Sequence, residues 1–154
     1  MSVAFRRESD EEHKEPKFEL PLPPGPNLVT ERGLAQIQAR VRELEAQIAA
    51  GGDEAALETA KRDLRYWRTR QSTAQVAPAP DGDLVAFGTR VTIRLNGAER
   101  TMSIVGDDEA DPARGLVSVS APLVKALLGA GVGEQLPFAG KEAAVEILAI
   151  EPLP

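Results

Sequence analysis

The 154-residue sequence contains no cysteine and a single histidine, His13. Without cysteine the chain cannot form a disulfide, a thiolate metal site or a cysteine nucleophile. The lone histidine lies in a polar N-terminal stretch, which argues against a histidine-based triad and against a zinc site. We therefore expect no catalytic residue, no metal and no cofactor of the protein's own.

The chain also lacks long apolar runs and a positive net charge. No run approaches the roughly 20 apolar residues of a membrane-spanning helix, and the charged N-terminus has no apolar signal-peptide core. The formal net charge is −6. This charge argues against a protein that wraps duplex DNA, because neutralising phosphates requires clustered lysine and arginine. These features predict a cytoplasmic protein that binds no membrane.

Residues 1–29 differ in composition from the rest of the chain. Charged side chains dominate first, and the stretch PLPPGP (21–26) follows. Such a composition cannot bury enough apolar surface to offset the entropy lost on ordering. We predict a flexible charged and Pro-rich arm over residues 1–29.

Residues 30–76 are predicted to form a short antiparallel helical hairpin. Thr30 and Asp53 suit the caps of two helices, and Gly51 and Gly52 end the first helix. Each helix of about 20 residues would be about 30 Å long at 1.5 Å per residue. Apolar seams recur at spacings of 3 and 4, as in coiled coils. They comprise Leu34, Ile37, Val41, Leu44 and Ile48 in the first helix, and Leu57, Ala60, Leu64, Trp67, Gln71 and Ala74 in the second.

Residues 77–83 (APAPDGD) are typical of a linker, and strand-like alternation follows. In the run 89–95 (TRVTIRL), Val91, Ile93 and Leu95 share one face. Asn96-Gly97 is a strong hairpin signal. Residues 84–152 are therefore predicted to form a small α+β domain with four or five antiparallel strands and one short helix. The expected strands are 89–95, 101–105, 116–120, 134–138 and 143–150, and the expected helix is 122–129.

The segment 106–115 (GDDEADPARG) is expected to be an acidic loop between two of these strands. Gly106 begins it, and we predict that this glycine adopts a backbone angle that other residues resist.

Several stretches resemble the Gre transcript cleavage factors of bacteria. In the second half these are VAFGTRVTI (85–93), SIVGDDEAD (103–111), LVSVSAPLVKALLG (116–129) and AAVEILAIE (143–151). In the first half they are LVTERGLAQIQ (28–38), Gly52-Asp53 and AQV (74–76), so the resemblance covers residues 28–152. It implies a coiled-coil hairpin followed by an FKBP-like domain.

The resemblance also implies a partner and a mode of action. Gre factors bind the coiled coil at the rim of the secondary channel of bacterial RNA polymerase. Acidic residues at their hairpin tip help the polymerase hold a second magnesium ion, with which the polymerase itself cleaves backtracked RNA. Here Asp53 and Glu54 would stand at that tip.

The sequence departs from the family in the length and chemistry of the hairpin. Both helical arms are about ten residues shorter than in the cleavage factors, which shortens the reach by about 15 Å at 1.5 Å per residue. Ala56 stands where the family has the glutamate of its tip pair. The sequence therefore predicts a monomeric, non-enzymatic elongation regulator that binds polymerase with little cleavage stimulation, similar to the nucleoside diphosphate kinase regulator type. The alternative is a true cleavage factor acting through Asp53 and Glu54.

The polymerase contacts implied by the family fall before the short helix. They match Ser120, Ala121 and Pro122, although the family often has an acidic residue at the position of Ser120. The acidic residues of the 106–115 loop either add to this surface or are simply solvated. They are Asp107, Asp108 and Glu109.

The second helix carries a basic face, which has two interpretations. It contacts nascent RNA or an acidic polymerase surface, or it is a solvated face opposite the apolar seam. Its residues are Lys61, Arg62, Arg65 and Arg68.

Two rival functions follow from the same features. An FKBP-like fold suggests a peptidyl-prolyl isomerase, but such an enzyme needs an aromatic-lined pocket, and from residue 77 onward the aromatics are only Phe87 and Phe138. The basic face alone suggests a direct nucleic-acid binder, which would bind with strong salt dependence and without polymerase.

Overall fold

The computed structural model describes residues 19–154, so residues 1–18 of the predicted arm lie outside the described residues. The described chain forms two compact units. One contains residues 19–24 and 38–72, and the other contains residues 25–37 and 73–154. The root of the hairpin therefore belongs to the same unit as the sheet domain, and the rest of the hairpin forms a unit with the end of the arm.

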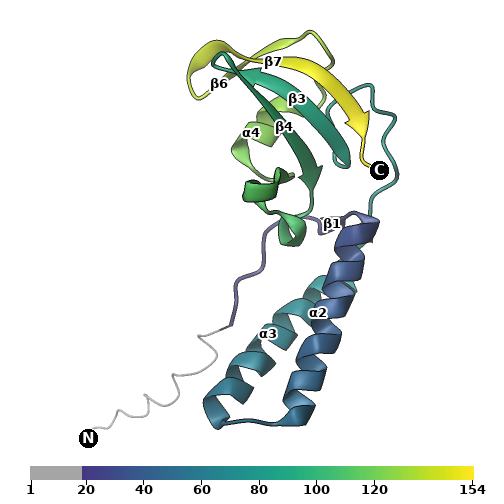
Figure 1. The fold of residues 1–154 in the computed structure, drawn as a ribbon, viewed down its shortest axis with the longest axis vertical. Helices are drawn as coiled ribbons and strands as arrows, with labels where there is room; N and C mark the ends of the chain where they lie inside the picture. The colour runs from purple at the N-terminus through teal and green to yellow at the C-terminus, as the bar shows by residue number, and fades with distance from the viewer. Residues whose placement is uncertain (1–18) are drawn as a thin grey trace, which may run out of the picture. The chain divides into compact units, whose positions relative to one another are not determined.

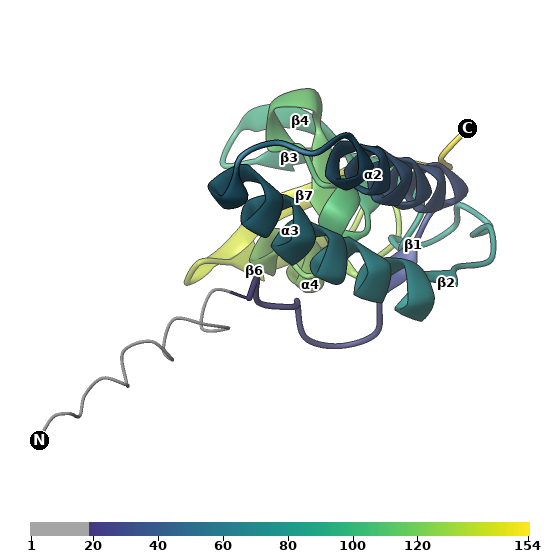
Figure 2. The same ribbon diagram turned by 90° about the horizontal axis from the view of Figure 1, so that it is seen from below.

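The predicted hairpin is present as helices α2 (Glu31–Ala50) and α3 (Glu54–Thr73), each of 20 residues. Figures 1 and 2 both show the two helices side by side. Both predicted caps are confirmed, because the Thr30 Oγ1 accepts a hydrogen bond from the Gly33 amide (2.9 Å) and the Asp53 Oδ1 accepts one from the Ala56 amide (2.7 Å). Within the described residues, neither these helices nor any other is long and apolar enough to cross a membrane.

The outer part of the hairpin has a small core of its own. Val41, Leu44, Ala60 and Leu64 are buried, with Ile48 and Trp67 packed against them, as the seams predict. The seam is wrong near the end of α3. There Gln71 is exposed and Arg70 is only 3% exposed instead, so the guanidinium of Arg70 is buried together with its aliphatic stem.

A short parallel strand pair replaces the last residues of the predicted arm and the last residues of the predicted hairpin, whose second helix ends at Thr73. Strand β1 (Leu28–Val29) pairs with β2 (Gln75–Val76). The side chain of the buried Asn27 donates a hydrogen bond to the Thr73 Oγ1 at 3.2 Å. Leu28 and Val29 are therefore part of the fold, because their backbone groups are paired.

The C-terminal domain is a five-stranded sheet with the order β5-β4-β3-β7-β6 and one short helix, which confirms the predicted α+β class. The strands are β3 (Thr89–Leu95), β4 (Ala98–Val105), β5 (Leu116–Ser118), β6 (Gln135–Phe138) and β7 (Lys141–Pro152), and the helix is α4 (Pro122–Leu127).

The prediction that all strands are antiparallel is wrong for one pair, since β4 and β5 run parallel. The predicted acidic loop between them contains two 3-10 helices, η4 (Asp107–Glu109) and η5 (Pro112–Arg114). A parallel pair needs a connection long enough to return the chain to the same end of the sheet, and this segment provides it.

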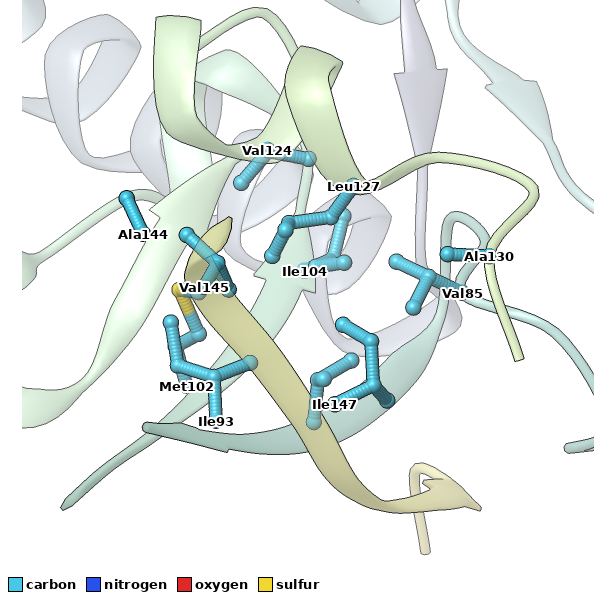
Figure 3. Close-up of a cluster of buried hydrophobic side chains, with 11 residues drawn as sticks. Val85, Ile93, Met102, Ile104, Val124, Leu127, Ala130, Ala144, Val145 and Ile147 are labelled. Carbon is cyan, nitrogen blue, oxygen red and sulfur yellow. The ribbon is translucent and has the colours of Figure 1, made fainter. Parts of the chain in front are cut away.

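The domain core lies between one face of the sheet and α4. Figure 3 shows Val124 and Leu127 of α4 directed toward Ile104 and Val145 of the sheet. The alternation predicted for β3 is confirmed, because Val91 and Ile93 are fully buried while Arg90 and Thr92 are partly exposed. The Asn96-Gly97 turn joins β3 to β4 with positive φ at both residues, as its sequence predicts.

Gly106 is needed for a different reason from the one predicted. Its φ is −75°, which any residue can adopt. A Cβ at this position would instead lie 2.3 Å from the carbonyl oxygen of Leu28. Glycine is required because the backbones of β1 and η4 pass so close to each other.

Candidate functional site

A polar cluster joins η4 to the loop between β5 and α4. The Ser118 and Ser120 hydroxyls both donate to the Asp107 Oδ1, at 2.5 and 2.7 Å. The Ser118 Oγ also accepts a hydrogen bond from the Ser120 amide at 3.0 Å. The structure thus brings together two predicted contact residues, Asp107 and Ser120, that are 13 positions apart in the chain.

The remaining loop residues continue this surface. Ala121 is the N-cap residue of α4, and Pro122 is its first residue and is exposed. The Ala121 carbonyl accepts the first helical hydrogen bond, from the Lys125 amide at 2.9 Å. Because Pro122 fixes its own φ and lacks an N–H, it starts the helix without leaving an unpaired donor.

The three acidic residues of η4 have different environments. Asp107 and Asp108 are half-buried, whereas Glu109 is buried with a side chain only 4% exposed. The Thr30 hydroxyl donates to the Glu109 Oε1 at 2.6 Å, and the Arg32 Nη1 lies 3.6 Å from its Oε2. The Glu109 carboxylate is thus directed into the protein, which leaves Asp107 and Asp108 as the acidic residues that can face a partner.

At the hairpin tip, Asp53 and Glu54 are exposed, but Asp53 also caps α3. One of its carboxylate oxygens is bonded to the Ala56 amide. Across residues 19–154, no group of three or more histidine, aspartate or glutamate residues is arranged to hold a metal ion.

The basic face of α3 is largely paired with carboxylates of the same chain. Arg62 pairs with Asp63 (3.1 Å), Arg68 pairs with Glu45 of α2 (2.9 Å), and Arg65 forms a two-pronged pair with Glu19. The hydrogen bonds from Arg65 lower the pKa of Glu19, and Glu19 in turn raises the pKa of Arg65. Exposed pairs of this kind are weak and easily displaced, so the face can still bind another anion.

One partly open depression lies beside the β3–β4 turn. Its lining is polar and contains no aromatic side chain, so it gives the isomerase interpretation no support. The lining residues include Arg94, Asn96, Gln135, Lys141 and Glu146.

The family model described as "Transcription elongation factor, GreA/GreB, C-term" matches residues 79–152. The C-terminal domain belongs to the GreA/GreB family. The match confirms the resemblance predicted from the sequence over residues 79–152. It includes the Asp107–Ser118–Ser120 cluster and Pro122, and it excludes the hairpin tip and the basic face.

Comparison with curated proteins finds relatives named transcription elongation factor GreA. The one from Thermomicrobium roseum is 35% identical over 98 residues, which is 64% of this chain and 63% of that protein. The one from Vibrio cholerae is 34% identical over 93 residues, or 59% of each chain. The chain thus spans about six tenths of the length of these two relatives.

Comparison with solved structures finds chains that are named GreA-type factors. The GreA factor homolog 1 (Gfh1) of Thermus thermophilus is 18% identical, covering 82% of this chain and 99% of that one, with a TM-score of 0.37. The GreA/GreB factor of Nitrosomonas europaea is 18% identical, covering 82% and 98%, with a TM-score of 0.38.

Sequence reasoning missed two residues, Ser118 and Glu19, and one contact between predicted residues, that of Glu109 with Thr30. Ser118 has a recognisable signal, because it alternates with Ser120 along the predicted strand 116–120 and would so share a face with it. The pairing of Glu109 with Thr30 has no such signal, since 79 positions separate the two residues. Glu19 was also missed, because nothing in the arm indicates that it pairs with α3.

Proposed function

We propose that the chain is a Gre-type transcription elongation factor that binds bacterial RNA polymerase at the rim of the secondary channel. It acts as a monomeric accessory factor in the cytoplasm and is not an enzyme. The GreA/GreB domain over residues 79–152 is the observation that carries this proposal. The hairpin enters the channel part-way and either competes with longer Gre factors or changes pausing.

The cluster around Asp107 supports a docking role for this domain. The Asp107 Oδ1 lies 2.7 Å from the Ser120 Oγ, so a negative charge stands beside residue 120, where the family often has an acidic side chain. A surface carboxylate bonded to Ser120, two residues before the exposed Pro122, suits a partner surface that presents lysine or arginine. Asp107 thus supplies a negative charge beside the neutral Ser120.

The hairpin supports binding with little cleavage stimulation. Helices of 20 residues are about 30 Å long. The family resemblance implies that the hairpin of a cleavage factor is longer by about 15 Å, because each of its arms has about ten more residues. Metal coordination tolerates errors of only about 0.2 Å. Asp53 caps α3, and Ala56 offers no second carboxylate.

Cleavage stimulation remains the second candidate, because Asp53 and Glu54 are both exposed at the tip. A transcript-cleavage assay on stalled elongation complexes separates the two functions. Polymerase binding without cleavage supports the first function. Stimulation that Asp53→Asn abolishes supports the second, and Asn is the matched variant because it caps a helix as well as Asp does.

Docking is tested by co-purification with core polymerase. We expect Asp107→Ala to weaken binding, because the charge and two hydroxyl contacts are lost together. Glu142→Ala is the control, since Glu142 is an exposed acid of β7 whose removal changes the net charge equally. Binding that both variants retain in full would exclude Asp107 from the interface, and a wild-type chain that ignores polymerase would contradict the proposed function itself.

A further inference from the structure

Glu109 is the acidic residue that the proposed docking surface does not use. Its side chain is 4% exposed, and its carboxylate contacts the Thr30 hydroxyl at 2.6 Å and the Arg32 guanidinium at 3.6 Å. Thr30 and Arg32 stand at the start of α2, whereas Glu109 belongs to η4 of the C-terminal domain. The contact therefore joins the first turn of the hairpin to the domain that we propose binds polymerase.

Two glycines allow this contact to form. A Cβ on Gly33 would lie 2.7 Å from the Glu109 Oε1, and a Cβ on Gly106 would lie 2.3 Å from the Leu28 carbonyl oxygen. Both distances are far below a normal van der Waals separation. Glycine at these two positions lets η4 approach β1 and the first turn of α2 closely enough for a direct hydrogen bond.

The Thr30 hydroxyl acts as a hydrogen-bond acceptor toward one partner and as a donor toward another. It accepts a hydrogen bond from the Gly33 amide, which caps α2, and it donates its own proton to Glu109. A cap needs only an acceptor. The donor function is thus separable from the capping function, and only the donor function links α2 to the domain.

We propose that Glu109 is a positioning residue, which holds the first turn of α2 against the GreA/GreB domain through Thr30. The contact fixes the first turn of α2, which is the root from which the hairpin continues. The effect on transcription rests on the proposed function, but the contact itself does not.

The test separates the two roles of Thr30 by substitution. Thr30→Asp keeps an acceptor that caps α2, but it removes the donor and sets a second carboxylate against Glu109. Adding Glu109→Gln restores a donor, since the glutamine amide can bond to Asp at position 30. Thr30→Ser is the matched control, because serine both caps and donates. Glu109→Ala is a second test variant that leaves the native cap intact.

The distance between two spin labels shows whether the contact holds α2 in a fixed position. The chain has no cysteine, so Ala35→Cys in α2 and Ala149→Cys in β7 provide two exposed labelling sites, both within the unit that contains the domain. We expect a narrow distance distribution for the wild type, Thr30→Ser and the double variant, and a broad one for Thr30→Asp and Glu109→Ala. Helix content by circular dichroism should stay unchanged in all of them.

Two results would overturn the proposal. One is a distribution for Glu109→Ala as narrow as that of the wild type. The other is a double variant as broad as Thr30→Asp, which would make Thr30 a cap only.

Polymerase assays then test the functional consequence. Glu109→Ala should bind core polymerase within about twofold of the wild type, because the proposed docking surface is untouched, and it should lose most of the effect on pausing. Retention of the full effect would contradict a positioning role. If the wild type does not bind polymerase, the proposed function fails, while the distance measurement still decides whether Glu109 fixes α2.

Discussion

At the scale of single residues, neighbouring acids of one short segment have different roles. Asp107 bonds two serine hydroxyls at the surface, whereas Glu109 is buried against Thr30. A 3-10 helix has three residues per turn, so consecutive side chains leave it about 120° apart. The composition of this segment indicates only an acidic loop. The environment of each carboxylate depends on the backbone conformation of the segment.

Gly106→Ala should destabilise the protein, because the new Cβ would lie 2.3 Å from the Leu28 carbonyl oxygen and the backbone cannot yield cheaply. We expect a loss of about 1–3 kcal/mol in the free energy of unfolding, as for other overpacking changes. Urea denaturation measures it. Gly131→Ala is the control, since its Cβ would meet neighbours at an ordinary 3.6 Å. An equal effect of both variants would refute the steric explanation.

The Glu19–Arg65 pair predicts a measurable titration. The hydrogen bonds from Arg65 lower the pKa of Glu19 in the folded state. Any stabilisation from the pair is therefore present above the pKa of the unfolded chain and is lost as the pH falls through the folded value. Arg65→Ala should raise the pKa of Glu19, followed by NMR of its carboxyl carbon, and Arg40→Ala should not. An unchanged titration in Arg65→Ala would show that the pair does not persist in solution.

At the scale of elements, the hairpin depends on few contacts. Four buried residues and two partly buried ones make up the core of its outer part. An isolated helix of 20 residues is only marginally stable in water, so these contacts decide whether α2 and α3 remain paired.

Leu44→Ala should therefore unfold the outer hairpin preferentially. Leu44 is 1% exposed, and such truncations cost about 2–5 kcal/mol in packed cores. Alanine has the higher helix propensity, so any loss reflects packing. Thermal denaturation followed at 222 nm should show a lowered midpoint for this variant. The neighbouring Glu43→Ala, at an exposed position, should change the midpoint little, and a similar shift in both would argue against a packed seam.

At the scale of the whole molecule, the proposed function makes transcript cleavage depend on both the length of the hairpin and the chemistry of its tip. Inserting eleven residues in each helix should lengthen the hairpin by about 16 Å. Eleven residues span close to three helical turns, so the apolar seam stays in phase. We expect transcript cleavage only when this insertion is combined with Ala56→Glu. The insertion alone and Ala56→Glu alone are the controls. Cleavage by the short hairpin carrying Ala56→Glu would show that length is not the limit.

The sequence by itself determined the two helices, their caps, the strands of the domain and the family. These features depend on local patterns, namely apolar spacing, capping residues and turn glycines, and on ordered motifs along the chain. The sequence did not determine the direction of β5, because alternation defines the faces of a strand and leaves its direction open.

Only the tertiary structure decided which polar groups meet. Thr30 and Glu109 are 79 positions apart, Asp107 and Ser120 are 13 apart, and Glu19 and Arg65 are 46 apart. Each pair forms because separate elements bring the two side chains together, and no local pattern encodes such a meeting. The same reason explains Gly106, whose requirement arises from a strand that lies far from it in the sequence.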